Sequence, residues 1–154
     1  MRITLTTLQQ HVKNNNKFSV LTCYDATFAK ILEGAGVDVL LVGDSLGNVL
    51  KGESTTLSVT LDDMIYHTRC VSSGSNRALI MADMPFGSYQ QSPQQAFDNA
   101  SKILAAGAHM VKIEGGQVMA ETTAFLTQRG IPVCAHIGLM PQSIHQLGGY
   151  KLQG

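Results

Sequence analysis

The sequence predicts an α/β fold, with a parallel sheet that forms part of a (β/α)8 barrel. Three observations lead to this prediction: short apolar runs recur five times, segments with helical spacing separate them, and polar residues follow the ends of the runs. Strands covered on both faces read as continuous runs rich in Val, Ile and Leu, and strands that alternate with helices indicate a parallel sheet. The predicted strands are residues 18–24, 37–43, 78–82, 109–113 and 131–135.

The segments between the predicted strands carry helix start signals. Thr60 and Asp63 form a capping-box-like pair, and Ser92 is followed by Pro93 at the first helical position and by Gln95. Apolar residues recur at helical intervals in four segments, which begin near Asp25, Thr60, Ser92 and Val118. The apolar stripe of the first segment is Phe28, Ala29, Ile31 and Leu32, and that of the last is Val118, Met119, Thr122, Phe125 and Leu126.

Two architectures fit this alternation, an open doubly wound sheet and a (β/α)8 barrel. A doubly wound dinucleotide fold needs a glycine-rich turn after its first strand, and residues 24–27 contain no glycine. We therefore favour the barrel, which needs eight strands and about 250 residues. The 154 residues form one domain with only about the first five βα units, and we expect no sixth strand at 150–154. The edges of the first and fifth strands would then be unpaired.

Composition excludes several classes of function. The formal net charge is zero and the basic residues are scattered, which argues against a nucleic-acid partner. We expect no membrane span, because no apolar stretch approaches ~18 residues, and the polar start predicts a cytoplasmic protein without a secretory signal. Charged residues make up only 14%, against roughly 25% in an average domain, which suggests that a partner subunit or further chain buries part of the surface.

Polar residues gather where the predicted strands end. Lys112 and Glu114 are two residues apart, so they point to the same side of their strand, while Val111 and Ile113 face the helices. Loops at the carboxyl ends of parallel strands converge on one mouth, where sites are built. The candidate residues at these ends are Asp25, Asp44, Ser45, Asp83, Glu114 and His136.

Three carboxylates at one mouth predict either a shifted pKa or a bound cation. Asp44, Asp83 and Glu114 would repel one another, so some must take a proton or a cation must lie between them. Oxygen ligands without a His or Cys cluster favour Mg²⁺. The alternative is that these acids cap the following helices, and we prefer it for Asp25. A lone histidine is more often structural, but the position of His136 favours a role in the site.

The strand ends also resemble a known family. The motifs are VGDSLGNVLKGESTTLSVTLDDMIYHT (42–68), ADMPFGSY (82–89), MVKIEGG (110–116), PVCAHIGLMPQS (132–143) and GGYKLQG (148–154). They are similar to ketopantoate hydroxymethyltransferase, and the likeness is collinear from about Thr6 to the last residue. The resemblance implies a (β/α)8 barrel that uses Mg²⁺ and 5,10-methylenetetrahydrofolate. Such an enzyme adds a hydroxymethyl group to 3-methyl-2-oxobutanoate, giving ketopantoate for pantothenate synthesis.

The resemblance also implies roles for single residues. The metal-associated acids correspond to Asp44, Asp83 and Glu114. The contacts to the 2-oxoacid correspond to Ser45, Lys112 and His136, with Asp44 and Asp83 beside the substrate and with Lys112 and His136 as the catalytic candidates. A cytoplasmic homo-oligomer, a decamer built from pentamers, is implied as well.

Several hypotheses stay open at this point. The family places its general base and further folate contacts beyond the fifth strand, where nothing here matches. The chain is then the N-terminal portion of a transferase, an inactive remnant that acts as an interaction partner, or a half-barrel that another chain completes. The runner-up enzyme is a Mg²⁺-dependent barrel of the phosphoenolpyruvate mutase and isocitrate lyase kind. The lyases use a KxCG-type motif, which is absent here.

Overall fold

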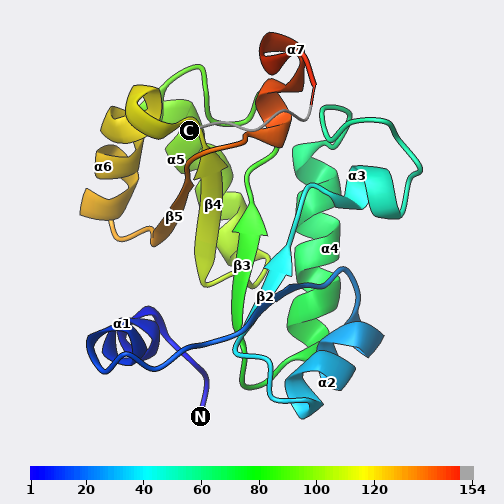
Figure 1. The fold of residues 1–154 in the computed structure, drawn as a ribbon, viewed down its shortest axis with the longest axis vertical. Helices are drawn as coiled ribbons and strands as arrows, with labels where there is room; N and C mark the ends of the chain where they lie inside the picture. Colours follow the sequence, from blue (N-terminus) through cyan, green and yellow to red (C-terminus); the bar gives the residue numbers. More distant parts are fainter. Residues whose placement is uncertain (150–154) are drawn as a thin grey trace.

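The computed structural model describes residues 1–149 as a parallel five-stranded sheet with helices packed along it (Figure 1). The expectation for residues 150–154 lies outside the described residues. The strands are β1 (Val20–Thr22), β2 (Val39–Val42), β3 (Leu79–Asp83), β4 (Met110–Glu114) and β5 (Val133–His136). The helices are α1 (Leu5–Lys13), α2 (Ala26–Gly34), α3 (Leu46–Val49), α4 (Leu61–Gly74), α5 (Pro93–Ala105), η1 (Gly116–Met119), α6 (Ala120–Gln128), η2 (Pro141–Ser143) and α7 (Ile144–Leu147).

The strands lie in chain order, β1-β2-β3-β4-β5, and each neighbouring pair is parallel. This order confirms all five predicted strands and the predicted βα alternation. Successive strands that are neighbours in one parallel sheet build a barrel wall rather than a doubly wound sheet, in which the strand order reverses. Within residues 1–149, β1 and β5 are the sheet edges, as expected, and Val20 and Leu21 of β1 are exposed.

The two faces of the sheet carry separate hydrophobic clusters. Val111 and Ile113 belong to the larger cluster, on the side where α2, α4, α5 and α6 pack. Met110, their strand neighbour, belongs to the smaller cluster on the opposite face. The predicted alternation along β4 is therefore confirmed, and the opposite face is the one toward which Lys112 and Glu114 point.

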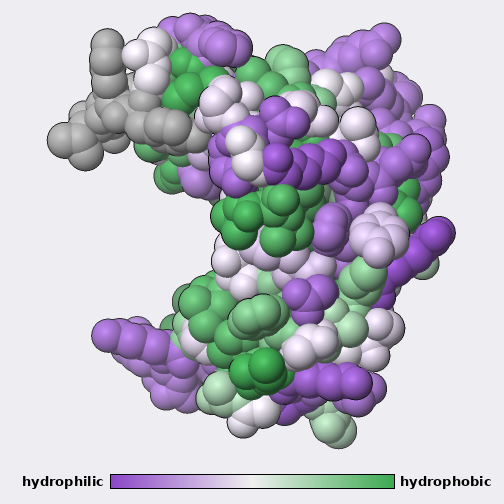
Figure 2. All heavy atoms as spheres, turned by 90° about the vertical axis from the view of Figure 1, so that its right-hand side faces the viewer, coloured by the Kyte–Doolittle hydropathy of each residue, from purple (hydrophilic) through white to green (hydrophobic). Residues whose placement is uncertain are grey.

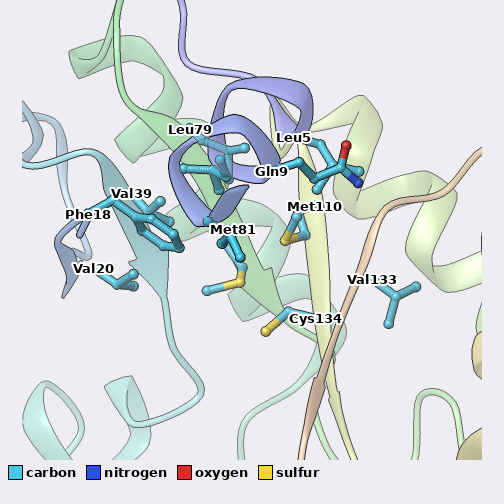
Figure 3. A pocket seen from close by; sticks show the side chains of 12 residues that line it. Leu5, Gln9, Phe18, Val20, Val39, Leu79, Met81, Met110, Val133 and Cys134 are labelled. Carbon is cyan, nitrogen blue, oxygen red and sulfur yellow. The ribbon is translucent and has the colours of Figure 1, made fainter. Parts of the chain in front are cut away.

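Helix α1 covers part of the face that carries the smaller cluster. This helix was not predicted from the sequence. Thr4 and Thr7 form a reciprocal capping box at its start, and Leu8 packs in the smaller cluster. Leu5 and Gln9 of α1 line an apolar pocket of about 290 Å³. Figure 3 shows this pocket, with Met81 and Met110 among its walls. Figure 2 shows a hollow that opens to one side of the molecule, with hydrophobic side chains along it. Among the helices of residues 1–149, none is long and apolar enough to cross a membrane.

The predicted helix caps are confirmed. Asp25 accepts a hydrogen bond from the Phe28 amide at 2.8 Å, and Ser92 accepts one from the Gln95 amide at 3.1 Å. Thr60 forms the reciprocal capping box at the start of α4. Asp25 thus has the capping role that we preferred for it.

Two predicted apolar stripes are only partly buried. On α2, Phe28 and Ile31 are each 57% exposed, because this helix packs on α4 with its other side. Val118 was predicted to belong to the apolar stripe over residues 118–126, but it is 83% exposed in η1. The tighter 3₁₀ turn changes the angular spacing of side chains, so Val118 turns outward while Met119 is buried.

Candidate active site

The carboxyl ends of β2, β3 and β4 bring three buried acids to one mouth. Asp83 and Glu114 end their strands, and Asp44 follows β2 by two residues. Their exposed fractions are only 4–5%. The backbone amide of Asp44 donates to Asp83 Oδ2 at 3.0 Å. The neighbouring Gly43 leaves room for this approach, because a Cβ there would lie 2.7 Å from Ser45 Oγ and 3.5 Å from Asp83 Oδ2.

The ammonium group of Lys112 lies among these acids. Its Nζ is 2.7 Å from Asp83 Oδ1 and 3.8 Å from Glu114 Oε1. Burial alone would lower the pKa of Lys112, but the charge and hydrogen bond of Asp83 and the charges of Glu114 and Asp44 outweigh burial and raise it. Lys112 is therefore a charged side chain, and it is the cation that offsets two of the three carboxylates.

Asp44 is less well compensated. Burial and the negative charge of Asp83 raise its pKa to about 7, although the hydrogen bond from Gln142 and the charge of Lys112 act in the opposite direction. This result bears out the expectation that three converging acids would shift a pKa. A divalent cation beside Asp44 and Asp83 would offset the repulsion from Asp83, which adds to burial in raising the Asp44 pKa.

Ser45 and His136 lie at the same end of the sheet with different partners. Ser45 is the N-cap residue of α3, yet its side chain makes no capping hydrogen bond; its Oγ lies 2.9 Å from Tyr24 Oη. His136 Nε2 lies 2.6 Å from the Leu139 carbonyl, within its own loop. The hydrogen bonds among residues 1–149 do not connect His136 to the acids, so its catalytic role stays a prediction.

Two residues of the site were missed in the sequence analysis. Gln142, in η2, is 5% exposed; its Nε2 donates to Asp44 Oδ2 at 2.8 Å, and its backbone amide donates to Glu114 Oε2 at 3.1 Å. Tyr89 is fully buried, and its Oη lies 2.6 Å from Gln142 Oε1 and 3.0 Å from the Glu114 amide nitrogen. Burial and the nearby carboxylates raise the pKa of Tyr89. Both residues occur within the motifs 82–89 and 132–143, but nothing in their spacing indicated contact with the acids.

The site offers a metal ion two carboxylate ligands rather than a complete set of protein ligands. In residues 1–149, no three His, Cys, Asp or Glu side chains converge as a metal-binding group. Glu114 contacts Lys112 and Gln142, which bridge it to Asp83 and to Asp44. Mg²⁺ commonly takes only one or two carboxylates and completes its shell with water and substrate oxygens. Asp44 and Asp83 fit that pattern, and Glu114 stays a predicted ligand.

The fold defines a class of protein. Among solved structures, the chain is similar to 2,3-dimethylmalate lyase, a member of the PEP mutase/isocitrate lyase superfamily, with a TM-score of 0.65 and 21% identity over 97% of this chain and 55% of that chain. It is also similar to phosphonopyruvate hydrolase in a complex with oxalate and Mg²⁺, with a TM-score of 0.65 and 15% identity over 83% of this chain and 50% of that chain. These likenesses show the fold: the chain forms part of the wall of a (β/α)8-type barrel.

The sequence comparisons then identify the family. The family model for ketopantoate hydroxymethyltransferase matches residues 2–154, and the chain belongs to this family. It is 69% identical to the 3-methyl-2-oxobutanoate hydroxymethyltransferase of Nitrosomonas europaea over 99% of this chain, and 67% identical to that of Nitrosospira multiformis over 100% of it. The chain spans 57% and 59% of the lengths of these curated relatives. The predicted family and the predicted barrel fold are thus confirmed.

Proposed function

We propose that the protein formed by this chain transfers a hydroxymethyl group from 5,10-methylenetetrahydrofolate to 3-methyl-2-oxobutanoate, giving ketopantoate. Relatives that are named for this reaction are 58–69% identical to the chain. The reading as a lyase of the phosphoenolpyruvate mutase kind is not favoured, because identities of 13–21% to those structures support only the fold.

The observation that carries the proposal is the half-buried ammonium group of Lys112, which forms ion pairs with Asp83 and Glu114 next to Asp44. Carbon–carbon bond formation next to the ketone requires loss of the proton on C3 of the oxoacid, which leaves negative charge on the keto oxygen. An ammonium group has three N–H donors, and Asp83 and Glu114 occupy two directions around Lys112 Nζ. A remaining donor can hydrogen-bond to the developing oxyanion.

Two further side chains would orient the oxoacid. The hydroxyl group of Ser45, already hydrogen-bonded to Tyr24, can donate to the substrate carboxylate. His136 is the second candidate, once its ring leaves the Leu139 carbonyl. Ser45 is held by Tyr24 before the substrate arrives, so its donation would cost little reorganisation during the reaction.

Asp44 and Asp83 are the residues that would hold Mg²⁺, with Glu114 beside them. When bound there, the ion would supply Lewis-acid stabilisation to the oxygens of the oxoacid. Water would cleave the methylene bridge of the folate, releasing tetrahydrofolate and leaving the carbon at the level of formaldehyde. The carbanion would add to that carbon, and the alkoxide that forms would take up a proton, in balance with the proton lost from C3. We further propose that this protein works in the cytoplasm as a homo-oligomer, which would cover apolar side chains such as Phe28 and Ile31.

Proton exchange at C3 tests the proposal. Proton NMR of 3-methyl-2-oxobutanoate in D₂O follows loss of the C3 signal in the presence of the chain and Mg²⁺, with EDTA as the metal-free sample. We expect metal-dependent exchange with the unchanged chain. Lys112→Met should slow the exchange by about 100-fold or more, as loss of a preorganised donor does.

Lys102→Met is the matched control, because Lys102 is an exposed lysine on α5. It should exchange at the rate of the unchanged chain. Absence of exchange in the unchanged chain would contradict the proposal for these 154 residues. Equal rates in Lys112→Met and in the control would contradict the role of Lys112.

A further inference from the structure

We infer that Gln142 is a positioning residue that holds the Asp44 carboxylate in the orientation in which it binds the metal ion. The inference rests on the proposed Mg²⁺-dependent function. Gln142 follows β5, and Asp44 follows β2, so their contact joins two strand ends that are far apart along the wall. The contact is buried, since Gln142 and Asp44 are 5% and 4% exposed.

The hydrogen bonds fix which end of the Gln142 amide faces Asp44. One partner is the backbone carbonyl of Met84, 2.9 Å from Gln142 Nε2, and a carbonyl only accepts. The nitrogen of the amide must therefore lie on that side. Its second N–H points to Asp44 Oδ2, at 2.8 Å. Gln142 thus fixes Asp44 Oδ2 by donation, which an apolar side chain of similar length cannot do.

The opposite end of the amide is held as firmly. Gln142 Oε1 only accepts, so the hydroxyl group of Tyr89 donates to it, over 2.6 Å. Gln90 Nε2 adds a longer hydrogen bond of 3.3 Å. Tyr89 is itself fixed, because its ring is fully buried and its Oη accepts a hydrogen bond from the Glu114 amide at 3.0 Å. Rotation of the Gln142 amide would break the contacts at both ends.

The same residue also contacts the third acid. The backbone amide of Gln142 donates to Glu114 Oε2 at 3.1 Å. Gln142 therefore links Asp44 to Glu114 without adding charge, whereas Lys112 forms ion pairs with Asp83 and Glu114. A neutral donor leaves the negative charge of the acids available to a cation. Outer partners that orient metal ligands in this way typically change metal affinity by about 10- to 100-fold when removed.

The test measures Mn²⁺ binding, with Mn²⁺ as the spectroscopic substitute for Mg²⁺. Electron paramagnetic resonance of free Mn²⁺ gives the dissociation constant for the unchanged chain and for Gln142→Met. Gln146→Met is the matched control, because Gln146 is exposed and lies four residues away. We expect affinity to fall by about 10-fold or more in Gln142→Met and to stay within twofold in the control. Far-UV circular dichroism and thermal unfolding show that each variant is folded.

A second variant, Tyr89→Phe, keeps the buried ring and the Gln142 side chain but removes the hydroxyl group that orients the amide. It should weaken Mn²⁺ binding several-fold, and it decides the result if Gln142→Met does not fold. Lower melting temperatures with unchanged Mn²⁺ affinity would show a merely structural role and overturn the inference. Absence of Mn²⁺ binding by the unchanged chain would overturn it as well.

Exchange at C3 of the oxoacid, followed on the same samples, separates this inference from the proposed function. Weaker Mn²⁺ binding in the two variants with no exchange in any sample supports the role of Gln142 and contradicts the proposed reaction. Exchange in the unchanged chain together with equal Mn²⁺ affinity in all variants would support the proposed reaction and contradict the role of Gln142.

Discussion

Lys112 Nζ lies 2.7 Å from Asp83 Oδ1, and the two side chains are only 14% and 5% exposed. The pair joins β4 to β3 across a buried surface, in register with the ladder that pairs Asp83 with Lys112. A buried ion pair is costly to break from one side, because the remaining charge has neither water nor a partner. We therefore expect the fold around these acids to depend on the charge of Lys112.

Lys112→Met should destabilise the chain by about 3 kcal/mol, since removal of one partner leaves Asp83 buried without its ion pair. Urea unfolding at pH 7 measures the change. The double variant Lys112→Met/Asp83→Asn should recover a large part of the loss, because both charges are then gone. A double variant that is less stable than the single one would disprove this explanation.

Glu33 should stabilise the junction between α4 and β3 in a pH-dependent way. Its carboxylate accepts hydrogen bonds from Ser75 Oγ and from the amides of residues 76–78. Burial raises the Glu33 pKa, but these hydrogen bonds outweigh burial and lower it to about 2. We expect Glu33→Gln to cost about 1–2 kcal/mol at pH 7.

The sign of the pH dependence follows from linkage. A carboxyl group whose pKa is lower in the folded state stabilises it fully above the unfolded value, about 4.3, and that contribution is lost as the pH falls toward 2. Urea unfolding at pH 7 and pH 3 should show the gap between Glu33→Gln and the unchanged chain shrinking at pH 3. The exposed Glu53→Gln is the control, and a gap that widens at low pH would refute the assignment.

Gly43→Ala should disturb the mouth of the site. The new Cβ would lie 2.7 Å from Ser45 Oγ, closer than packed atoms allow, and Ser45 would have to leave Tyr24. We expect a loss of about 1–3 kcal/mol in thermal unfolding. Adding Ser45→Ala should relieve most of the clash, and no recovery in the double variant would point to another cause.

Gly74→Ala should separate α4 from α2. A Cβ at Gly74 would lie 2.3 Å from the Ala26 carbonyl oxygen and 2.7 Å from its Cα, and backbone atoms cannot move aside cheaply. We expect a loss of at least about 2 kcal/mol. Gly34→Ala is the control, because nothing lies within 4 Å of a Cβ there. Calorimetric melting compares the two, and equal melting temperatures would show that the helices adjust.

The fold was predictable because its signals are local. Apolar runs that contain β2, β3 and β4 are nearly continuous, so their burial on both faces is visible in the sequence, and the caps at Asp25 and Thr60 depend on neighbours three residues away. Helix α1 was missed because its capping box uses Thr7 rather than Glu or Gln. Val118 was misplaced because 3₁₀ and α spacing differ by less than one residue per turn.

The sequence by itself determined the family, the strand order and the strand ends at which Asp44, Asp83, Lys112 and Glu114 gather, since a parallel sheet brings all its carboxyl ends to one edge. Only the tertiary structure decided how these charges are held. Gln142 lies 98 residues from Asp44 in the chain and Tyr89 lies 53 residues from Gln142, so no local spacing could reveal their contacts. Hydrogen bonds at 2.6–2.8 Å depend on the placement of side chains after the strands have packed.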